Sequence, residues 1–325
     1  MCTGFTFKSN DQVIMGRTMD YTFPLAGMPS VTPRNYYWES RIDYKGRTKY
    51  GFIGTGCDMG GYLYGDGVNE HGLAVSVQYA RGYASYGTKI KPGKMNIAHT
   101  ETIFWILGYN QDIDDLERNK SEVNLVADVL DDISEAPPVH YHVSDATGRS
   151  VELTFEDGSF NLTENPVGVL TNDPGLDWHY RNLERYKHIT PAQHDSIDLE
   201  DNVSYKGNEN GTYGLPGGYT SPERFVRAAF LKQYIAHDGY PSHDILDAFK
   251  ILNSVSIPKG VLSPNVDPYH YTLYVTVLNL TKPALYVKWY DSTEITELEL
   301  TESLITRDEM TFFEPETAFV TRKLN

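Results

Sequence analysis

Two stretches near the start of the chain, CTGFTFKS (residues 2–9) and QVIMGRTMDY (residues 12–21), decide how the remaining sequence is interpreted. The first alternates in character, which places Thr3, Phe5 and Phe7 on one face of a strand. The turn-prone tripeptide SND separates it from the second stretch, which is also strand-like. The two stretches therefore predict a β-hairpin, with a cysteine at the beginning of its first strand.

Groups of strands and helices alternate along the rest of the chain. Strand patterns occur at residues 72–79, 139–146, 150–156, 271–280 and 284–290. Apolar spacing near 3.6 predicts helices at residues 100–109, 121–133, 220–235 and 243–255. We expect Ser121 and Ser221 to cap two of these helices, with Pro222 at a first helical position. Two further segments are a strand–loop–helix unit at 169–186 and an acidic, solvated strand or helix face at 293–303.

This order of elements predicts an α+β fold in which helices pack outside antiparallel sheets. Since no convincing linker interrupts the chain, we expect one domain over residues 1–325. Residues 187–219 are polar with few apolar anchors, and they are interpreted as a long excursion. Such long loops tend to serve function or assembly.

Composition excludes several classes of protein. The net charge of −16 argues against nucleic acid as a partner, because binding to phosphates requires an excess of Lys and Arg. It also argues against an electrostatic membrane contact, and no apolar run is long enough to span a bilayer. No signal peptide is evident, and the 2 cysteines lack C-x-x-C spacing. A cytoplasmic location is therefore expected.

The position of Cys2 raises the question of whether it is a nucleophile. If Met1 is removed, the thiol and a free α-amino group belong to one residue, and such an amine can accept the thiol proton near neutral pH. A nearby Arg17 would favour the thiolate, and Asp20 would hold the amine. Residues three apart on a strand face opposite ways, so these two can converge only if the strand ends or bulges, and Gly16 is suited to a bulge. The alternatives are an incidental terminal cysteine and a surface Arg17–Asp20 ion pair.

Four features together resemble one known family: the opening Cys2, GRTMDY (16–21), LTNDPGLDWHYRNL (170–183) and SPERFVRAAF (221–230). They are similar to the choloylglycine hydrolase family, which includes penicillin V acylases and conjugated bile salt hydrolases, and the resemblance extends over essentially the whole chain. It implies an αββα sandwich of the N-terminal nucleophile hydrolase type. It also implies that the cysteine lies at the end of a central strand, and that no metal or other cofactor is required.

The resemblance assigns roles to three residues of the hairpin. Cys2 matches the nucleophile, Asp20 the aspartate that holds its amine and thiol, and Arg17 an arginine beside the sulfur. These roles imply an amide hydrolase that passes through a thioester.

The same resemblance assigns roles to three residues elsewhere in the chain. Asn172 matches a side chain that donates to the oxyanion, a role suited to a neutral amide, and the backbone N–H of Tyr79 matches the second donor. Arg224 matches a second active-site arginine better than Arg227 does. Without the family, Asn172 would be a turn residue before Pro174, and Arg224 would be an exposed helix residue.

The substrate is predicted from subfamily differences. Bile salt hydrolases typically carry asparagine where this chain has Tyr79, whereas penicillin V acylases carry tyrosine, and Gly175 and Trp178 also resemble the acylases. The main expectation is hydrolysis of penicillin V to phenoxyacetate and 6-aminopenicillanate. The alternatives are a hydrolase of glycine or taurine bile conjugates and a catalytically silent binding protein that retains Met1.

A bulky apolar acyl group requires an aromatic-rich cleft. We expect this cleft to be lined by residues near the nucleophile strand, namely Met19, Tyr21, Phe23, Met59 and Tyr62.

Three other features have simpler interpretations. His140 and His142 share a strand face and are a weak metal pair without a third ligand nearby. Cys57 is expected to be a small buried residue. By resemblance, the 187–219 excursion clasps a neighbouring subunit, which implies a homotetramer.

Overall fold

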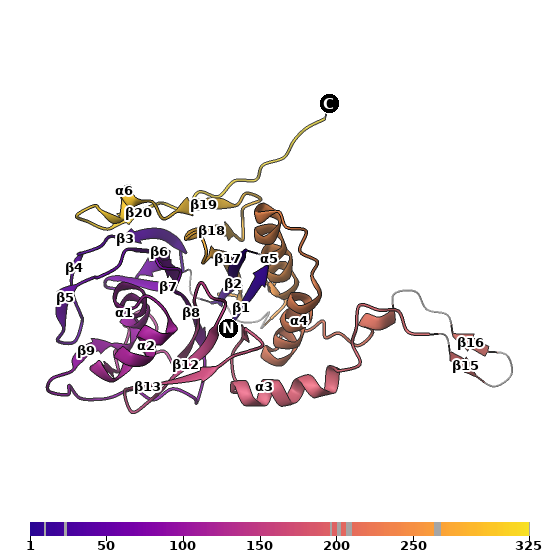
Figure 1. The fold of residues 1–325 in the computed structure, drawn as a ribbon, viewed down its shortest axis with the longest axis horizontal. Coiled ribbons are helices and arrows are strands. Elements are labelled where there is room, and N and C mark those ends of the chain that lie inside the picture. The colour runs from indigo at the N-terminus through magenta and orange to yellow at the C-terminus, as the bar shows by residue number, and fades with distance from the viewer. Residues whose placement is uncertain are drawn as a thin grey trace.

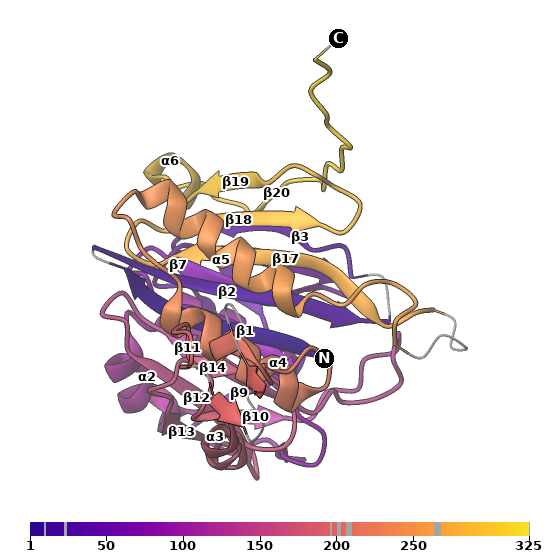
Figure 2. The same ribbon diagram turned by 90° about the vertical axis from the view of Figure 1, so that its right-hand side faces the viewer.

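Two antiparallel sheets lie face to face, and helices cover the outer face of each (Figure 1 and Figure 2). The computed structural model describes residues 1–9, 11–22, 25–195, 197–199, 203–205, 210–262 and 268–324. The arrangement confirms the predicted α+β fold and its αββα layering.

The six-stranded sheet contains the first hairpin. Its strand order is β14 (Val169–Leu170), β1 (Cys2–Ser9), β2 (Gln12–Tyr21), β17 (Tyr271–Asn279), β18 (Ala284–Trp289) and β19 (Thr296–Glu299). The eight-stranded sheet has the order β13 (Ser159–Glu164), β12 (Ser150–Glu156), β11 (Val139–Ser144), β8 (Ala74–Tyr79), β7 (Tyr62–Asn69), β6 (Phe52–Asp58), β3 (Met28–Thr32) and β20 (Thr311–Phe312). Smaller pairs are formed by β4 (Tyr37–Glu39) with β5 (Lys45–Arg47), and by β9 (Met95–Ala98) with β10 (Val123–Val126).

Different helices cover the two sheets. The eight-stranded sheet is covered by α1 (Thr102–Tyr109), which α2 (Ile113–Asn119) follows. The six-stranded sheet is covered by α4 (Ser221–Tyr234) and α5 (Pro241–Val255), with α3 (Leu176–Leu183) packed beside α4. A short helix, α6 (Glu302–Ile305), follows β19.

The alternation of the first hairpin gives each face of β1 a separate task. Phe5 and Phe7 pack in the apolar core beneath α4 and α5. Gly4 and Thr6 face the other sheet, where Thr6 Oγ1 lies 2.8 Å from Ser144 Oγ. A Cβ on Gly4 would lie 2.6 Å from a side-chain nitrogen of Gln78 and 3.1 Å from His142 Nδ1, so a larger residue here would have to displace these side chains of the other sheet. The first hairpin is therefore confirmed, with Cys2 opposite Met19 in its register.

The helix predicted at 121–133 is wrong. Residues Val123–Val126 form β10, which pairs in parallel with β9, and all four are buried. The apolar residues in this window satisfied a helical spacing, but a strand partner was available for its β-branched valines. The cap of α4 also differs by one residue, because Thr220 and not Ser221 is the N-cap and forms a capping box with Glu223.

The 187–219 excursion projects from the side of the sandwich and includes the antiparallel pair β15 (Ile197–Leu199) and β16 (Val203–Tyr205) (Figure 1). Its two arms are joined at the base, where the Thr190 N–H donates to the Gly211 carbonyl at 2.9 Å. The homotetramer built on this excursion stays a prediction. Among the described residues, no helix combines the length and the apolar character needed to cross a membrane.

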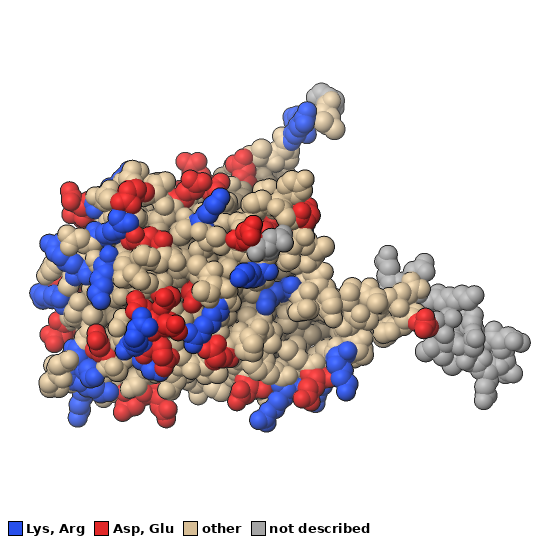
Figure 3. Space-filling view, in the orientation of Figure 1, with Lys and Arg blue, Asp and Glu red and all other residues tan. Residues whose placement is uncertain are grey.

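Charge is mixed over the face shown in Figure 3, where Lys and Arg side chains lie among Asp and Glu. The described part of this face therefore presents no continuous basic track of the kind that a phosphate backbone requires.

The two histidines considered as a metal pair have other partners. His140 Nδ1 lies 2.7 Å from Glu152 Oε1, and its Nε2 lies 2.9 Å from the Thr171 carbonyl oxygen. His142 Nε2 lies 2.7 Å from Ser150 Oγ. These bonds account for three of the four ring nitrogens and tie β11 to its neighbours.

Buried histidines predict a loss of stability in acid. Burial lowers the pKa of His142 to about 3 and that of His99 to about 4. An unfolded histidine titrates near ~6.5, so below that pH the unfolded chain binds protons that the native protein does not. Above about pH 6.5 these histidines therefore cost no stability. Below that pH the free energy of unfolding falls, by about 2 kcal/mol per histidine at pH ~5.

Urea unfolding at several pH values measures this effect. His142→Gln should show a shallower fall in unfolding free energy between about pH 7 and pH 5 than the wild-type protein. Parallel curves for the two proteins would contradict the assignment.

Candidate active site

Cys2 is buried at the beginning of β1, and its sulfur, its backbone N–H and its carbonyl oxygen each have a side-chain partner. Its sulfur accepts a hydrogen bond from Arg17 Nη2 at 3.7 Å. Its backbone N–H donates to Asn172 Oδ1 at 3.0 Å, and its carbonyl oxygen accepts from Arg224 Nη1 at 2.8 Å. Three residues predicted from the sequence thus contact the cysteine directly.

Arg17 and Asp20 approach Cys2 from opposite faces of β2. Pairing of β1 with β2 is regular through Gly16, so the bulge considered there is absent, and Asp20 lies instead next to the end of β2 at Tyr21. The irregularity lies in β17, between Thr272 and Tyr274. The side chains therefore alternate regularly along β2, and Arg17 and Asp20 lie on opposite sides of Cys2.

The alternative interpretation of these two residues as a surface ion pair is also wrong. Both side chains are buried, and Arg17 pairs instead with Asp66 from β7, with Nη1 3.1 Å from Oδ2. A second Arg17 nitrogen, Nη2, donates to the Val77 carbonyl at 3.1 Å.

The carboxylate of Asp20 is held on the helix-facing side of the sheet. Thr18 Oγ1 donates to it at 3.0 Å and Thr272 Oγ1 at 2.6 Å. Arg224 Nη1 lies 3.8 Å from Oδ2. The Asp20 backbone carbonyl, not its carboxylate, accepts from the Met1 amine at 2.6 Å.

The orientation of the Asn172 amide follows from its partners. Oδ1 receives the Cys2 N–H and Arg224 Nη2, the latter at 2.7 Å, and neither group can accept a hydrogen bond. Nδ2 therefore points the other way and donates to the Tyr79 carbonyl at 2.7 Å. Ser221 Oγ holds the Asn172 backbone through both its N–H and its carbonyl, each at 3.0 Å.

Arg224 is fully buried, in contrast to the exposed residue that its place in the first turn of α4 suggests. Its guanidinium joins the Cys2 carbonyl, Thr3 Oγ1 and Asn172 Oδ1. Arg227 instead donates to backbone carbonyls of the neighbouring loops and of α5. The structure therefore places Arg224, and not Arg227, beside Cys2.

Met1 occupies part of the site. Its amine lies 3.3 Å from His270 Nε2, and burial lowers the pKa of this amine below its ordinary value. While Met1 is attached, the Cys2 nitrogen is an amide and cannot accept a proton.

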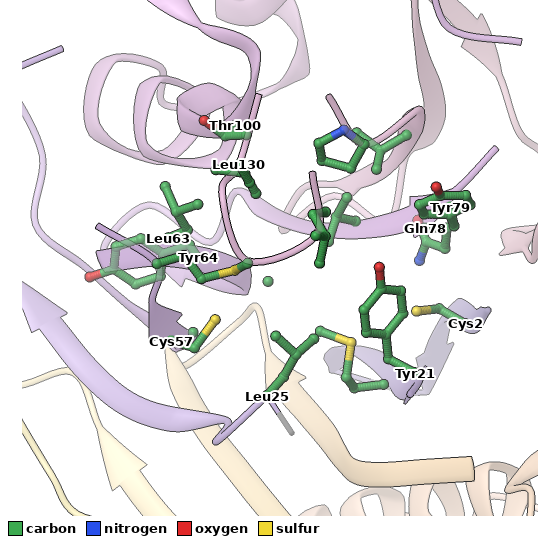
Figure 4. A pocket seen from close by; sticks show the side chains of 18 of the residues that line it. Cys2, Tyr21, Leu25, Cys57, Leu63, Tyr64, Gln78, Tyr79, Thr100 and Leu130 are labelled. Atoms are coloured by element: carbon green, nitrogen blue, oxygen red, sulfur yellow. The ribbon is translucent and has the colours of Figure 1, made fainter. Parts of the chain in front are cut away.

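An apolar cleft opens beside the Cys2 sulfur (Figure 4). Cys2, Tyr21 and Tyr79 lie at one end, while Cys57 and Leu63 lie toward the other. The predicted lining residues Met19, Tyr21 and Met59 are present in it.

Two predictions about the cleft need correction, and one lies outside the described residues. Tyr62 is not among the lining residues, because its hydroxyl donates to the Met28 carbonyl and its ring packs against Tyr64. Cys57 is half-buried in the cleft wall and is not a core residue, although its surroundings still raise its pKa to about 11 by burial. Phe23 falls outside the described residues.

Sequence reasoning missed the opposite wall of the cleft. It comes from the segment between β10 and β11, which contributes Leu130, Ile133 and Pro137. Tyr79 contacts this segment through a hydrogen bond from its hydroxyl to Glu135. No local signal could reveal these residues, because they reach the cleft only through the packing of sheet and loop.

The chain is similar to known proteins over most of its length. Residues 2–313 match the model of the linear amide C–N hydrolases of the choloylglycine hydrolase family. A bile salt hydrolase/transferase of Lactiplantibacillus plantarum is 33% identical, with 92% of each chain covered. One from Clostridium perfringens is 28% identical, with 95% of each covered. The crystal structure of a mutant conjugated bile acid hydrolase from Clostridium perfringens matches with a TM-score of 0.89, at 26% identity over 100% of both chains.

Penicillin V acylases are more distant. The one from Pectobacterium atrosepticum is 24% identical over 66% of this chain and 56% of its own. The structure of the one from Agrobacterium tumefaciens has a TM-score of 0.77 at 21% identity, covering 97% of this chain and 92% of its own, and this likeness shows the fold alone. The comparisons therefore support the alternative substrate class better than the penicillin V that the sequence favoured.

Proposed function

This chain belongs to the linear amide C–N hydrolases of the choloylglycine hydrolase family, and we propose that it cleaves bile acids conjugated to glycine or taurine. The observation that carries the proposal is the buried Cys2 thiol at one end of an apolar cleft. An acyl group as large and apolar as a steroid acid suits such a cleft, with its amide carbon at the sulfur. The bile salt hydrolases among the relatives support this substrate class.

The reaction begins after Met1 has been removed. The Cys2 α-amine takes the thiol proton while the sulfur attacks the amide carbon, and the carbonyl π electrons move to oxygen. On collapse, the C–N bond breaks and the departing amine takes the proton from the ammonium. Water then attacks the thioester, gives a proton to the same amine, and the thiolate leaves and is reprotonated.

Neighbouring groups are positioned to act on the oxyanion, on the Cys2 backbone and on the sulfur during these reaction steps. Asn172 Nδ2 has two hydrogens, of which one is bonded to the Tyr79 carbonyl, and we assign the other to the oxyanion. The Tyr79 backbone N–H is the proposed second donor. Arg224 holds the Cys2 carbonyl from the helix side, the Asp20 carboxylate lies beside the Arg224 guanidinium, and Arg17 faces the sulfur.

Penicillin V is retained as a second candidate because of Tyr79. Its ring lines the cleft, and its hydroxyl contact with Glu135 joins β8 to the opposite wall near Cys2. A phenoxyacetyl group is smaller than a steroid acid, and in this alternative its ring would lie against Tyr79. A silent binding protein that retains Met1 is the alternative from another class.

A side-by-side assay distinguishes these three candidate functions. We expect kcat/KM for glycocholate or taurocholate to exceed that for penicillin V by roughly tenfold or more, since pockets of one shape discriminate apolar groups by about this much. Intact-mass analysis of the same preparation establishes whether Met1 is absent. A reversed ratio would favour the acylase, and a Met1-free protein that hydrolyses none of the three substrates would reject the proposal.

A further inference from the structure

Asp66 is a buried carboxylate on β7, and it pairs with Arg17, the arginine that contacts the Cys2 sulfur. We propose that it is a positioning residue, which holds the Arg17 guanidinium against the Cys2 sulfur. The inference rests on the proposed role of Cys2 as nucleophile. It adds to the site a residue from the eight-stranded sheet, whereas Cys2 and Arg17 both belong to the six-stranded sheet.

Four donors converge on the two oxygens of Asp66, whose side chain is fully buried. Oδ2 accepts from Arg17 Nη1 at 3.1 Å and from Thr276 Oγ1 at 2.7 Å. Oδ1 accepts from the Thr55 hydroxyl at 2.7 Å and from the Thr55 backbone N–H at 3.2 Å. Each oxygen is therefore held by one hydroxyl and by one N–H group.

Only a carboxylate satisfies this set. A hydroxyl can reverse its role and accept a hydrogen bond, but the N–H groups of Arg17 and of the Thr55 backbone cannot. An asparagine here would point its NH₂ group at the N–H of Arg17 or at the backbone N–H of Thr55, whichever way its amide is turned. The site is thus built for a negative charge.

Asp66 acts on the sulfur through the rigid guanidinium of Arg17. Because this group is planar, a fixed Nη1 also fixes the direction of Nη2. Nη2 reaches Cys2 Sγ at 3.7 Å, together with Met19 Sδ at 3.3 Å and the Val77 carbonyl at 3.1 Å. Within the described residues, Asp66 is the one carboxylate paired with Arg17, and the Arg17 Nε has no hydrogen-bond partner.

Removal of the carboxylate should therefore release Arg17. A buried cation without its anion either moves toward another partner or draws water into the site, and both outcomes take Nη2 from the sulfur. Because a neighbouring cation favours the thiolate, we expect Cys2 to become less reactive at neutral pH.

The test measures the thiol and needs no substrate. Met1-free protein is alkylated with iodoacetamide over a range of pH, and mass spectrometry of peptides reads Cys2 and Cys57 separately. In Asp66→Asn, the alkylation of Cys2 at about pH 7 should slow roughly tenfold, with the midpoint of its pH profile at higher pH. In an Arg17→Leu background, the same substitution should add nothing.

Two further variants make the result specific. Asp114→Asn removes a carboxylate from the exposed pair with Arg149 and should leave the profile unchanged. Thr276→Val keeps the charge of Asp66 but removes one of its holding bonds, and should shift the profile in the same direction by less. This variant decides the matter if Asp66→Asn does not fold.

An unchanged Cys2 profile in folded Asp66→Asn, or in Thr276→Val where the first variant does not fold, would overturn the inference. A midpoint at lower pH would do the same, because it would mean that the charge of Asp66 and not its hold on Arg17 matters. Hydrolysis of glycocholate is measured in parallel. A shifted profile in an enzyme that hydrolyses no bile conjugate would reject the proposed function and leave the role of Asp66 intact.

Discussion

Cys2→Ala is expected to lower the turnover of any amide substrate by roughly 10⁵–10⁶-fold, the scale seen when an enzyme loses its nucleophile. Alanine removes the sulfur that forms the thioester but keeps the backbone bonds to Asn172 and Arg224. The fold should therefore persist, with a thermal midpoint close to that of the wild-type protein. Steady-state hydrolysis and thermal unfolding on one preparation measure both quantities.

Cys2→Ser is the matched comparison. It preserves the shape of the side chain but replaces the thiol with a hydroxyl, which is a far weaker nucleophile at its own pKa, so strong impairment is expected. Wild-type protein that retains Met1 by intact mass should also be inactive, because its Cys2 nitrogen is an amide. Full activity in Cys2→Ala would end the assignment of the nucleophile.

Asn172→Ala should lower kcat by roughly 10²–10³-fold, as is typical for the loss of one oxyanion donor. KM should change much less, since the donor acts on charge that develops after binding. Some activity should remain because the proposed Tyr79 backbone donor is unaffected. Measurement of kcat, KM and the thermal midpoint distinguishes this from a role in shaping the turn before Pro174, where lost activity would follow lost folded protein.

Asn172→Asp tests the donor separately from the scaffold. The carboxylate still offers an oxygen to the Cys2 N–H and to Arg224, but it has no N–H for the oxyanion. A fall in kcat at least as large as in Asn172→Ala is expected. An unchanged kcat in either folded variant would remove Asn172 from the proposed mechanism.

Local pattern was sufficient where a strand or helix has one strongly preferred environment. The alternation placed Phe5 and Phe7 on one face of β1, which the structure packs beneath the helices, and regular apolar spacing predicted α4. The window at 121–133 failed because short apolar runs satisfy either period, and only pairing with β9 made Val123–Val126 a strand.

The resemblance to a family named residues whose own surroundings gave no warning of their positions. Arg224, at the start of a surface helix, and Asn172, before a proline, both had ordinary structural interpretations. Their burial beside Cys2 became visible only when α4 and the segment after β14 packed against β1. Tyr62 shows the limit of such reasoning, because proximity in sequence to the cleft did not predict where its ring would pack.

By itself, the sequence determined the first hairpin, the α+β order of elements and the identity of a cysteine that one cleavage would make terminal. Side-chain periodicity and chain position are local properties, so they can be recognised without a model of the fold. The tertiary structure alone decided which charges surround that cysteine. Asp66, in the glycine-rich stretch YGDGV, has the sequence of a turn, yet it is buried on a strand of the other sheet. A buried ion pair between two sheets depends on how the sheets stack, and no spacing along the chain encodes that distance.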